Sequence, residues 1–144
     1  MQLSQEADMQ VYKKILVTMD CSSVDDLIVE HASALAIQNK AEITLLHVVH
    51  SHTLGQDRVL RASAETFLKD RADGLQSRGV RTRILIKSGE PDEEILQEIE
   101  EGDYDLVAMA MHGHSFIGDI LFGSVSRTLK HRISIPLLLI GPER

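Results

Sequence analysis

A segment rich in glycine and histidine, AMHGHSFIGDILFGSVS (residues 110–126), carries the groups most suited to ligand binding. Gly113 lets the backbone approach a ligand closely because glycine has no Cβ. Gly123 and Ser124 open a predicted helix, where free N–H groups and the positive end of the helix dipole favour an anion. The segment therefore predicts an anion site, and a phosphate group fits it. Two established phosphate motifs are absent from the sequence: it has no GxxxxGK[ST], and the turn MDCSS has no GxGxxG.

The elements that must position this segment follow from the pattern of apolar residues. Short apolar runs rich in β-formers predict strands, and apolar residues three and four positions apart predict helices. Strands are expected over residues 13–19, 41–49, 80–87, 104–110 and 135–141. Helices are expected over residues 22–40, around residues 60–75, over 88–102 and over 123–133. A helix thus separates each strand from the next, which leaves no room for hairpins.

This alternation predicts an α/β fold. Such chains form a mostly parallel sheet with right-handed crossovers and helices on both faces. In these sheets ligands bind beyond the carboxyl ends of the strands, at the point where the strand order reverses. The segment 110–126 leaves the carboxyl end of the fourth strand, so we expect it at the edge where a ligand binds.

Composition narrows the class of protein. The 144 residues suffice for one domain with a single core. With 22 acidic and 15 basic residues the formal charge is -7, and no cluster of Lys and Arg is longer than a pair. This balance argues against nucleic acid and anionic membrane surfaces as partners. The single cysteine, Cys21, excludes an intramolecular disulfide.

The N-terminal residues point to a cytoplasmic location. MQLSQEADMQ has neither the basic nor the apolar region of a signal peptide, and no apolar run reaches the ~18 residues that a membrane span needs. We therefore expect a cytoplasmic protein without membrane insertion. Residues 1–10 are expected to form a disordered tail, followed by one domain over residues 11–144.

The chain resembles the universal stress protein family, in the branch that binds ATP. The nucleotide motif of that branch is G-x2-G-x9-G-[ST]. Gly113, the nine residues HSFIGDILF and the pair Gly123–Ser124 match it, and Ala110 stands in place of the first glycine, so the pattern here is A-x2-G-x9-G-S. The resemblance extends from YKKILVTMDCS through LLHVV and SGEP to SIPLLLIG.

The resemblance implies a fold, a site and partners. The fold is a three-layer α/β sandwich around a five-stranded parallel sheet of order 3-2-1-4-5 with helices on both faces. The implied site residues are Thr18, Met19 and Asp20 beside the nucleoside, Val48 at the adenine through its backbone, Met109, Ala110, His112 and Gly113 on one side of the phosphates, and Gly123, Ser124, Val125 and Ser126 on the other. The implied cofactors are ATP and Mg²⁺. The implied partners are a second copy of the chain, paired through the fifth strand (Ile135 to Ile140), and a protein that the sequence does not identify.

Several residues near the predicted site also have a structural interpretation. Asp20, Ser22 or Ser23 could cap the following helix. His47 closes an apolar strand and is interpreted as a hydrogen-bonded structural residue rather than a catalyst. Cys21 stands near a helix N-terminus, which lowers the pKa of a thiol, yet a passive half-buried thiol is the favoured interpretation.

Two further groups have structural interpretations. The histidines 47, 50, 52, 112 and 114 are expected near one edge, but spacing alone does not fix coordination geometry, so no metal site is predicted. The acids Glu93, Glu94, Glu98, Glu100 and Glu101 are interpreted as a solvated helix face.

Three functions stay open at this point. The first is an ATP-binding regulatory protein of stress adaptation that presents a nucleotide-dependent surface to a partner. The second is a dimeric interaction or scaffold protein that has lost useful ATP binding, and the third is a slow ATPase or nucleotidyl-transferring enzyme. Retention of Gly113 and of Gly123–Ser124 favours the first over the second. The third is disfavoured because no paired acid and base are evident, and no catalytic residue is predicted.

Overall fold

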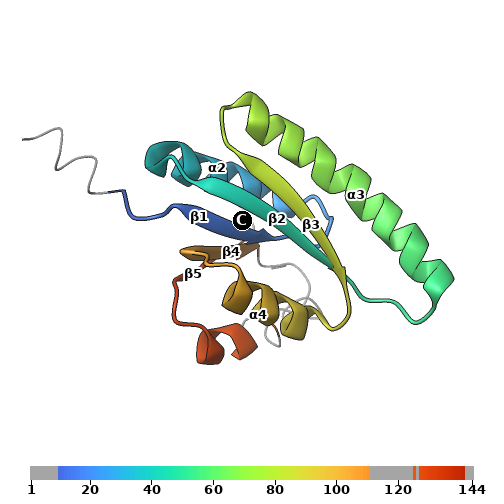
Figure 1. Cartoon of the computed structure of the whole chain (residues 1–144). Coiled ribbons are helices and arrows are strands. Elements are labelled where there is room, and N and C mark those ends of the chain that lie inside the picture. Colours follow the sequence, from blue (N-terminus) through green and yellow to red (C-terminus); the bar gives the residue numbers. More distant parts are fainter. Residues whose placement is uncertain (1–9, 111–124, 126, 142–144) are drawn as a thin grey trace, which may run out of the picture.

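Strands and helices alternate along the chain as the apolar pattern predicts. The computed structural model in Figure 1 describes residues 10–110, 125 and 127–141. Its strands are β1 (Lys14–Thr18), β2 (Glu42–Val49), β3 (Thr82–Ser88), β4 (Leu106–Ala110) and β5 (Leu137–Ile140). Helices α2 (Asp25–Asn39), α3 (Leu54–Ser77) and α4 (Pro91–Glu101) connect the first four strands, and residues 127–132 are helical before β5.

The strands form one parallel sheet in the order β3-β2-β1-β4-β5. This confirms the predicted fold class and strand order. The order reverses between β1 and β4, and there Thr18 at the end of β1 lies beside Leu46 of β2 and Met109 of β4. The carboxyl ends of these three strands therefore meet at the edge where a ligand is expected.

Helices cover both faces of the sheet, with α2 and α3 on one side and α4 on the other (Figure 1). Side chains alternate along each strand, so Ile15 and Val17 of β1 pack in a cluster with Ile28 of α2 and Leu68 of α3, here the α2/α3-face cluster. On the other face, Leu16, Val107, Ile95 and Leu129 belong to the α4-face cluster. A fully buried aliphatic side chain contributes about 1.5–3 kcal/mol, so these two clusters hold the three layers together. Within the described residues, no helix is both long and apolar enough to cross a lipid bilayer.

Helix α3 begins before the predicted range, at Leu54. Thr53 is its N-cap, and the Thr53 hydroxyl accepts the N–H of Gln56 at 3.0 Å. A Thr followed three residues later by Gln is a helix-start signal that apolar spacing does not register. The first turns project past the end of β3 (Figure 1), and Leu54 and Val59 are exposed there.

Glu98 on α4 does not lie on a solvated face, so that interpretation is wrong for this residue. Its side chain is 10% exposed, whereas Glu93, Glu100 and Glu101 are exposed and Glu94 is half-buried. The Glu98 carboxylate accepts the Tyr104 hydroxyl at 2.7 Å and lies 3.3 Å from the Lys87 ammonium and 3.7 Å from the Arg83 guanidinium. Glu98 thus joins α4 to the edge strand β3.

Replacing Glu98 by Ala is expected to lower the free energy of unfolding by about 1–3 kcal/mol, because the Tyr104 hydroxyl and the two cations lose their acceptor. Urea denaturation measures the change. The control is Glu100→Ala on the exposed side of the same helix, expected within about 0.5 kcal/mol of the wild type. Equal losses in the two variants would show that the Glu98 contacts do not stabilise the fold.

Candidate functional site

Six of the seven predicted site residues that the structure describes gather at the carboxyl ends of three neighbouring strands. Thr18 ends β1, and Met19 and Asp20 follow it. Val48 lies near the end of β2, and Met109 and Ala110 end β4. Val125 is helical, and its side chain packs against the α4-face cluster. The remaining predicted residues, His112, Gly113, Gly123, Ser124 and Ser126, lie outside the described residues.

A side chain of β2 ties the ends of β1 and β2 together. The Nδ1 atom of His47 lies 2.7 Å from the carbonyl oxygen of Met19. A carbonyl oxygen can only accept, so this nitrogen carries the hydrogen and donates it. The Met19 N–H donates in turn to the Leu46 carbonyl at 2.8 Å. These bonds confirm the interpretation of His47 as a hydrogen-bonded structural residue.

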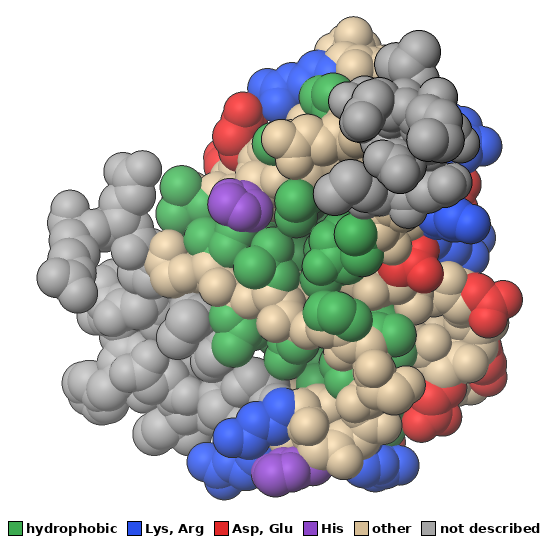
Figure 2. Space-filling view, turned by 90° about the vertical axis from the view of Figure 1, so that its left-hand side faces the viewer, with side chains coloured by type: hydrophobic (Ala, Val, Ile, Leu, Met, Phe, Trp, Pro, Cys, Tyr) green, Lys and Arg blue, Asp and Glu red, His purple; other side chains and the backbone are tan. Residues whose placement is uncertain are grey.

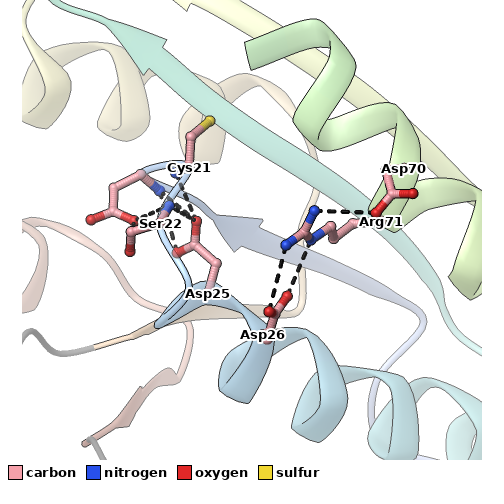
Figure 3. A network of polar contacts seen from close by, with 7 residues as sticks. Cys21, Ser22, Asp25, Asp26, Asp70 and Arg71 are labelled. Carbon is pink, nitrogen blue, oxygen red and sulfur yellow. Dashed lines mark hydrogen bonds and ion pairs between the residues drawn. The ribbon is translucent and has the colours of Figure 1, made fainter. Parts of the chain in front are cut away.

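The turn between β1 and α2 is organised by Asp25, a residue that the sequence interpretation missed. The Asp25 carboxylate accepts the N–H groups of Cys21 at 2.7 Å, Asp20 at 3.1 Å and Ser22 at 3.2 Å (Figure 3). Asp25 is 2% exposed. The backbone at Cys21 has φ of +66°, the left-handed region, which lets these N–H groups converge on one carboxylate.

No side chain caps helix α2, so the capping interpretations of Asp20, Ser22 and Ser23 are wrong. The N-cap is Val24, and the N–H groups of Asp25 and Asp26 donate to the Ser22 and Ser23 carbonyls instead. Asp20 has another local role, because its Oδ1 accepts the N–H of Ser22 at 3.1 Å and the Ser22 hydroxyl at 2.8 Å. Asp20 itself is exposed.

Helical periodicity was the signal that could have found Asp25. It stands on one helical face with Ile28, Ala32 and Ala36, and all of them are buried. A carboxylate on the buried face of a helix must find donors there. The donors are the amides of the preceding turn.

Burial and like charge shift two pKa values in this turn. Burial first, and then the neighbouring Asp20 carboxylate, raise the pKa of Asp25 to about 7. Burial, followed by the charges of Asp25 and Asp20, raises the pKa of Cys21 to about 12. These effects outweigh the charge of Arg71, which lowers the pKa of Cys21, so Cys21 is a neutral thiol at pH 7. This supports its interpretation as a passive thiol.

Two site residues are buried through their side chains. Val48 is 9% exposed, and its side chain packs in the α4-face cluster, so that side chain is not available to a ligand. Ala110 is 8% exposed, and its methyl group belongs to the α2/α3-face cluster. Among described non-glycine residues, left-handed φ occurs at Cys21, Lys40 and Asp103, so Ala110 keeps the extended backbone of a strand.

Two histidines at this edge contact neighbouring side chains. His50 lies 3.6 Å from the Glu90 carboxylate, and its ring meets the His52 ring edge-on with centroids 5.6 Å apart. Across residues 10–110, 125 and 127–141, no group of three or more His, Cys, Asp and Glu side chains is arranged to hold a metal ion. The described edge thus presents to a ligand the exposed Asp20 carboxylate and the backbone of the strand ends, beside these exposed histidines.

Comparison with known proteins decides the family. The family model described as "Universal stress protein family" matches residues 11–141. The chain belongs to the universal stress protein family. A universal stress protein of Methanothermobacter thermautotrophicus is 31% identical over 134 residues, which are 85% of this chain and 90% of the relative.

Solved universal stress protein structures share the fold. That of MJ0577 from Methanocaldococcus jannaschii superposes with a TM-score of 0.79 at 25% identity, and the match covers 93% of this chain and 99% of that one. A universal stress protein family protein of Arabidopsis thaliana, whose structure has AMP bound, gives a TM-score of 0.70 at 20% identity over 91% of this chain and 92% of that one. The predicted family and architecture are thus confirmed.

Proposed function

We propose that this universal stress protein binds an adenine nucleotide, ATP with Mg²⁺, and acts in the cytoplasm as a regulatory protein of stress adaptation through a nucleotide-dependent partner surface. One observation carries the proposal. The exposed Asp20 follows the carboxyl end of β1, where the strand order reverses between β1 and β4, and the A-x2-G-x9-G-S segment starts at the end of β4. The AMP bound to the Arabidopsis relative supports an adenine nucleotide as the ligand class.

The hydrogen bonds of the β1–α2 turn indicate which part of the nucleotide it meets. Asp25 already occupies the N–H groups of residues 20–22, so these three amides are not available to a phosphate. Asp20 offers a carboxylate, which accepts hydrogen bonds from hydroxyl groups and repels phosphate. We therefore assign Thr18, Met19 and Asp20 to the nucleoside, with the Asp20 carboxylate on the ribose hydroxyls, and the Val48 backbone to the adenine.

The phosphates are assigned to the other side of the site. The proposed residues are Met109, Ala110, His112 and Gly113 at one end of the glycine-rich segment and Gly123, Ser124, Val125 and Ser126 at the other. Residues 127–132 are helical, so the second group stands at the N-terminal side of a helix, where backbone N–H groups favour anions. Mg²⁺ enters with the triphosphate, because this ion keeps several waters and binds through phosphate oxygens and one or two carboxylates.

Bound nucleotide identified by mass spectrometry, in protein denatured directly after purification, tests the proposal. ATP is the expected finding, followed by saturable ATP binding in calorimetry once the nucleotide has been removed. ADP or AMP alone would turn the assignment toward a hydrolysing enzyme. Protein free of nucleotide that also fails to bind ATP would contradict the proposal and favour a dimeric interaction protein.

We further propose that the protein forms a homodimer through Ile135 to Ile140. Strand β5 lies at the edge of the sheet, and an apolar edge strand is open to pairing with another chain. Leu139 is 38% exposed. A cavity of about 270 Å³ adjoins β5, lined by Tyr12, His31, Leu35, Leu106, Pro136, Leu137 and Leu138. On the side of the molecule where β1 begins and β5 lies, hydrophobic side chains gather in the middle of the face (Figure 2).

Leu139→Lys is expected to weaken such a dimer by at least about tenfold, because it removes apolar contact area and places two lysines across the two-fold axis. Sedimentation velocity over a range of protein concentrations measures dissociation. Leu54→Lys, which changes an 87% exposed leucine on α3, is the matched control and should leave the dimer unchanged. A wild-type protein that stays monomeric at every concentration would remove the dimer from the proposal.

A further inference from the structure

Two charged residues are buried in the described part of the chain, and their surroundings differ. Glu98 faces Lys87 and Arg83. Asp25 faces three backbone N–H groups and the carboxylate of Asp20. A buried carboxylate placed beside a second carboxylate costs free energy, so stability alone does not account for Asp25. What Asp25 provides is a fixed conformation of the turn that carries Asp20.

The two oxygens of Asp25 have separate tasks. Oδ2 accepts the N–H groups of Cys21, Asp20 and Ser22 at 2.7, 3.1 and 3.2 Å. Oδ1 lies 3.4 Å from the Asp20 nitrogen, which is farther than Oδ2 lies from the same nitrogen. Burial, and then the neighbouring Asp20 carboxylate, favour a proton on Asp25 near pH 7.

The other charged side chains near Asp20 and Asp25 are paired with partners of their own. On α2, the next residue, Asp26, turns away and binds the Arg71 guanidinium of α3 at 3.1 Å, and Asp70 of α3 lies 3.2 Å from the same guanidinium (Figure 3). The turn itself adds the neutral Cys21 thiol. Arg71, the cation that α3 brings near the turn, is thus paired with Asp26 and Asp70, although its charge still lowers the pKa of Cys21.

We propose that Asp25 is a positioning residue of the nucleotide site: it holds the β1–α2 turn so that the Asp20 carboxylate stands where it accepts the ribose hydroxyls. The inference rests on the proposed function, since the ligand is the proposed adenine nucleotide. In this role an amide can replace the carboxyl group, because an asparagine oxygen accepts the turn N–H groups and its NH₂ donates to Asp20. The methyl group of an alanine can neither accept these hydrogen bonds nor donate one.

The test compares Asp25→Ala, Asp25→Asn and the control Asp26→Ala by two readouts. Calorimetry gives the affinity for ATP, and the alkylation rate of Cys21 by iodoacetamide reports the turn, since Cys21 is the one cysteine of the chain. Asp25→Ala is expected to lose at least about tenfold in ATP affinity and to react faster at Cys21. Asp25→Asn should stay within about threefold of the wild type in affinity, and Asp26→Ala should match the wild type in affinity.

A pH series supplies a measurement that does not depend on the folding of Asp25→Ala. Below pH 7 the pair carries one negative charge less, so the wild type should bind the anionic ATP more tightly at pH 6 than at pH 8. Asp25→Asn should lack this part of the dependence, and comparing the two proteins in the same buffers cancels the titration of ATP itself.

The outcomes separate the inference from the function on which it rests. If the wild type binds ATP, and Asp25→Ala binds it equally well or Asp25→Asn keeps the pH dependence, the positioning role is overturned and the proposed function stands. If the wild type does not bind ATP, the proposed function fails and the role in the site fails with it. Faster alkylation of Asp25→Ala than of Asp25→Asn, which lacks the same charge, would then show that Asp25 holds the turn for the fold alone.

Discussion

Asp20→Ala is expected to weaken ATP binding by about tenfold to a hundredfold while the protein stays folded. The Asp20 carboxylate is exposed, does not cap α2, and makes its described side-chain bonds with Ser22. Its removal therefore costs the fold little. A hydrogen bond to a charged group is worth about 1.5–3 kcal/mol, which corresponds to this loss of affinity when the ribose loses its acceptor.

Two comparisons sharpen that experiment. Calorimetry with adenosine should show the same loss as ATP, because the assigned contact is with the ribose and not with the phosphates. Ser22→Ala, which removes a hydroxyl that donates to Asp20 and leaves the carboxylate in place, should change affinity much less. An unchanged dissociation constant for Asp20→Ala, with an unchanged melting temperature, would place the nucleoside elsewhere.

The second large effect on ATP affinity is expected from replacing Gly123, and a much smaller one from replacing Ala110. Gly123 lies outside the described residues, so this prediction rests on the motif and on the helix that follows at residues 127–132. Gly123→Val should weaken ATP binding by more than about a hundredfold, because a branched side chain keeps the anion from the N–H groups at the start of a helix.

Ala110→Gly, by contrast, should change ATP affinity by no more than about tenfold. Ala110 has a strand backbone that needs no glycine, and its methyl group packs in the α2/α3-face cluster. The variant should lower stability by about 0.5–1 kcal/mol through the added backbone freedom. Calorimetric titration orders the two variants. A wild type that does not bind ATP, beside an Ala110→Gly variant that does, would identify Ala110 as the residue that silenced the site and favour the interaction protein.

Most of the fold could be predicted because apolar spacing records which side of each element is buried. Ile15, Leu16 and Val17 are all fully buried, the sign of a strand covered on both faces, and β1 is indeed the central strand. The early start of α3 at Leu54 was missed because a polar cap at Thr53, not an apolar residue, sets it. The interpretation of Glu98 as solvated is wrong because charge alone does not show which side of the helix a residue occupies. Glu98 stands next to the buried Ile99 and is itself buried.

The candidate site, like the fold, could be predicted only in part. Strand order brings Asp20, Val48 and Ala110 to one edge, and that order follows from the alternation of elements. The role of Asp25 does not follow from it, because it depends on the left-handed backbone at Cys21, a residue type that gives no local sign of that conformation. Hydrogen bonds in a turn are set by dihedral angles, and apolar periodicity carries no information about them.

The strand order also bears on how the chain reaches its native state. Val17 of β1 pairs with Leu45 of β2, a neighbour along the chain, and with Ala108 of β4, which lies far beyond it. Closing the longer loop costs more entropy, so the β1–β2–β3 half is expected to assemble first, and the docking of β4 to follow. The edge between β1 and β4 exists only after that late step. A nucleotide bound at this edge would slow the dissociation of β4 from β1. It would not hold the β1–β2–β3 half, which could unfold or stay folded independently.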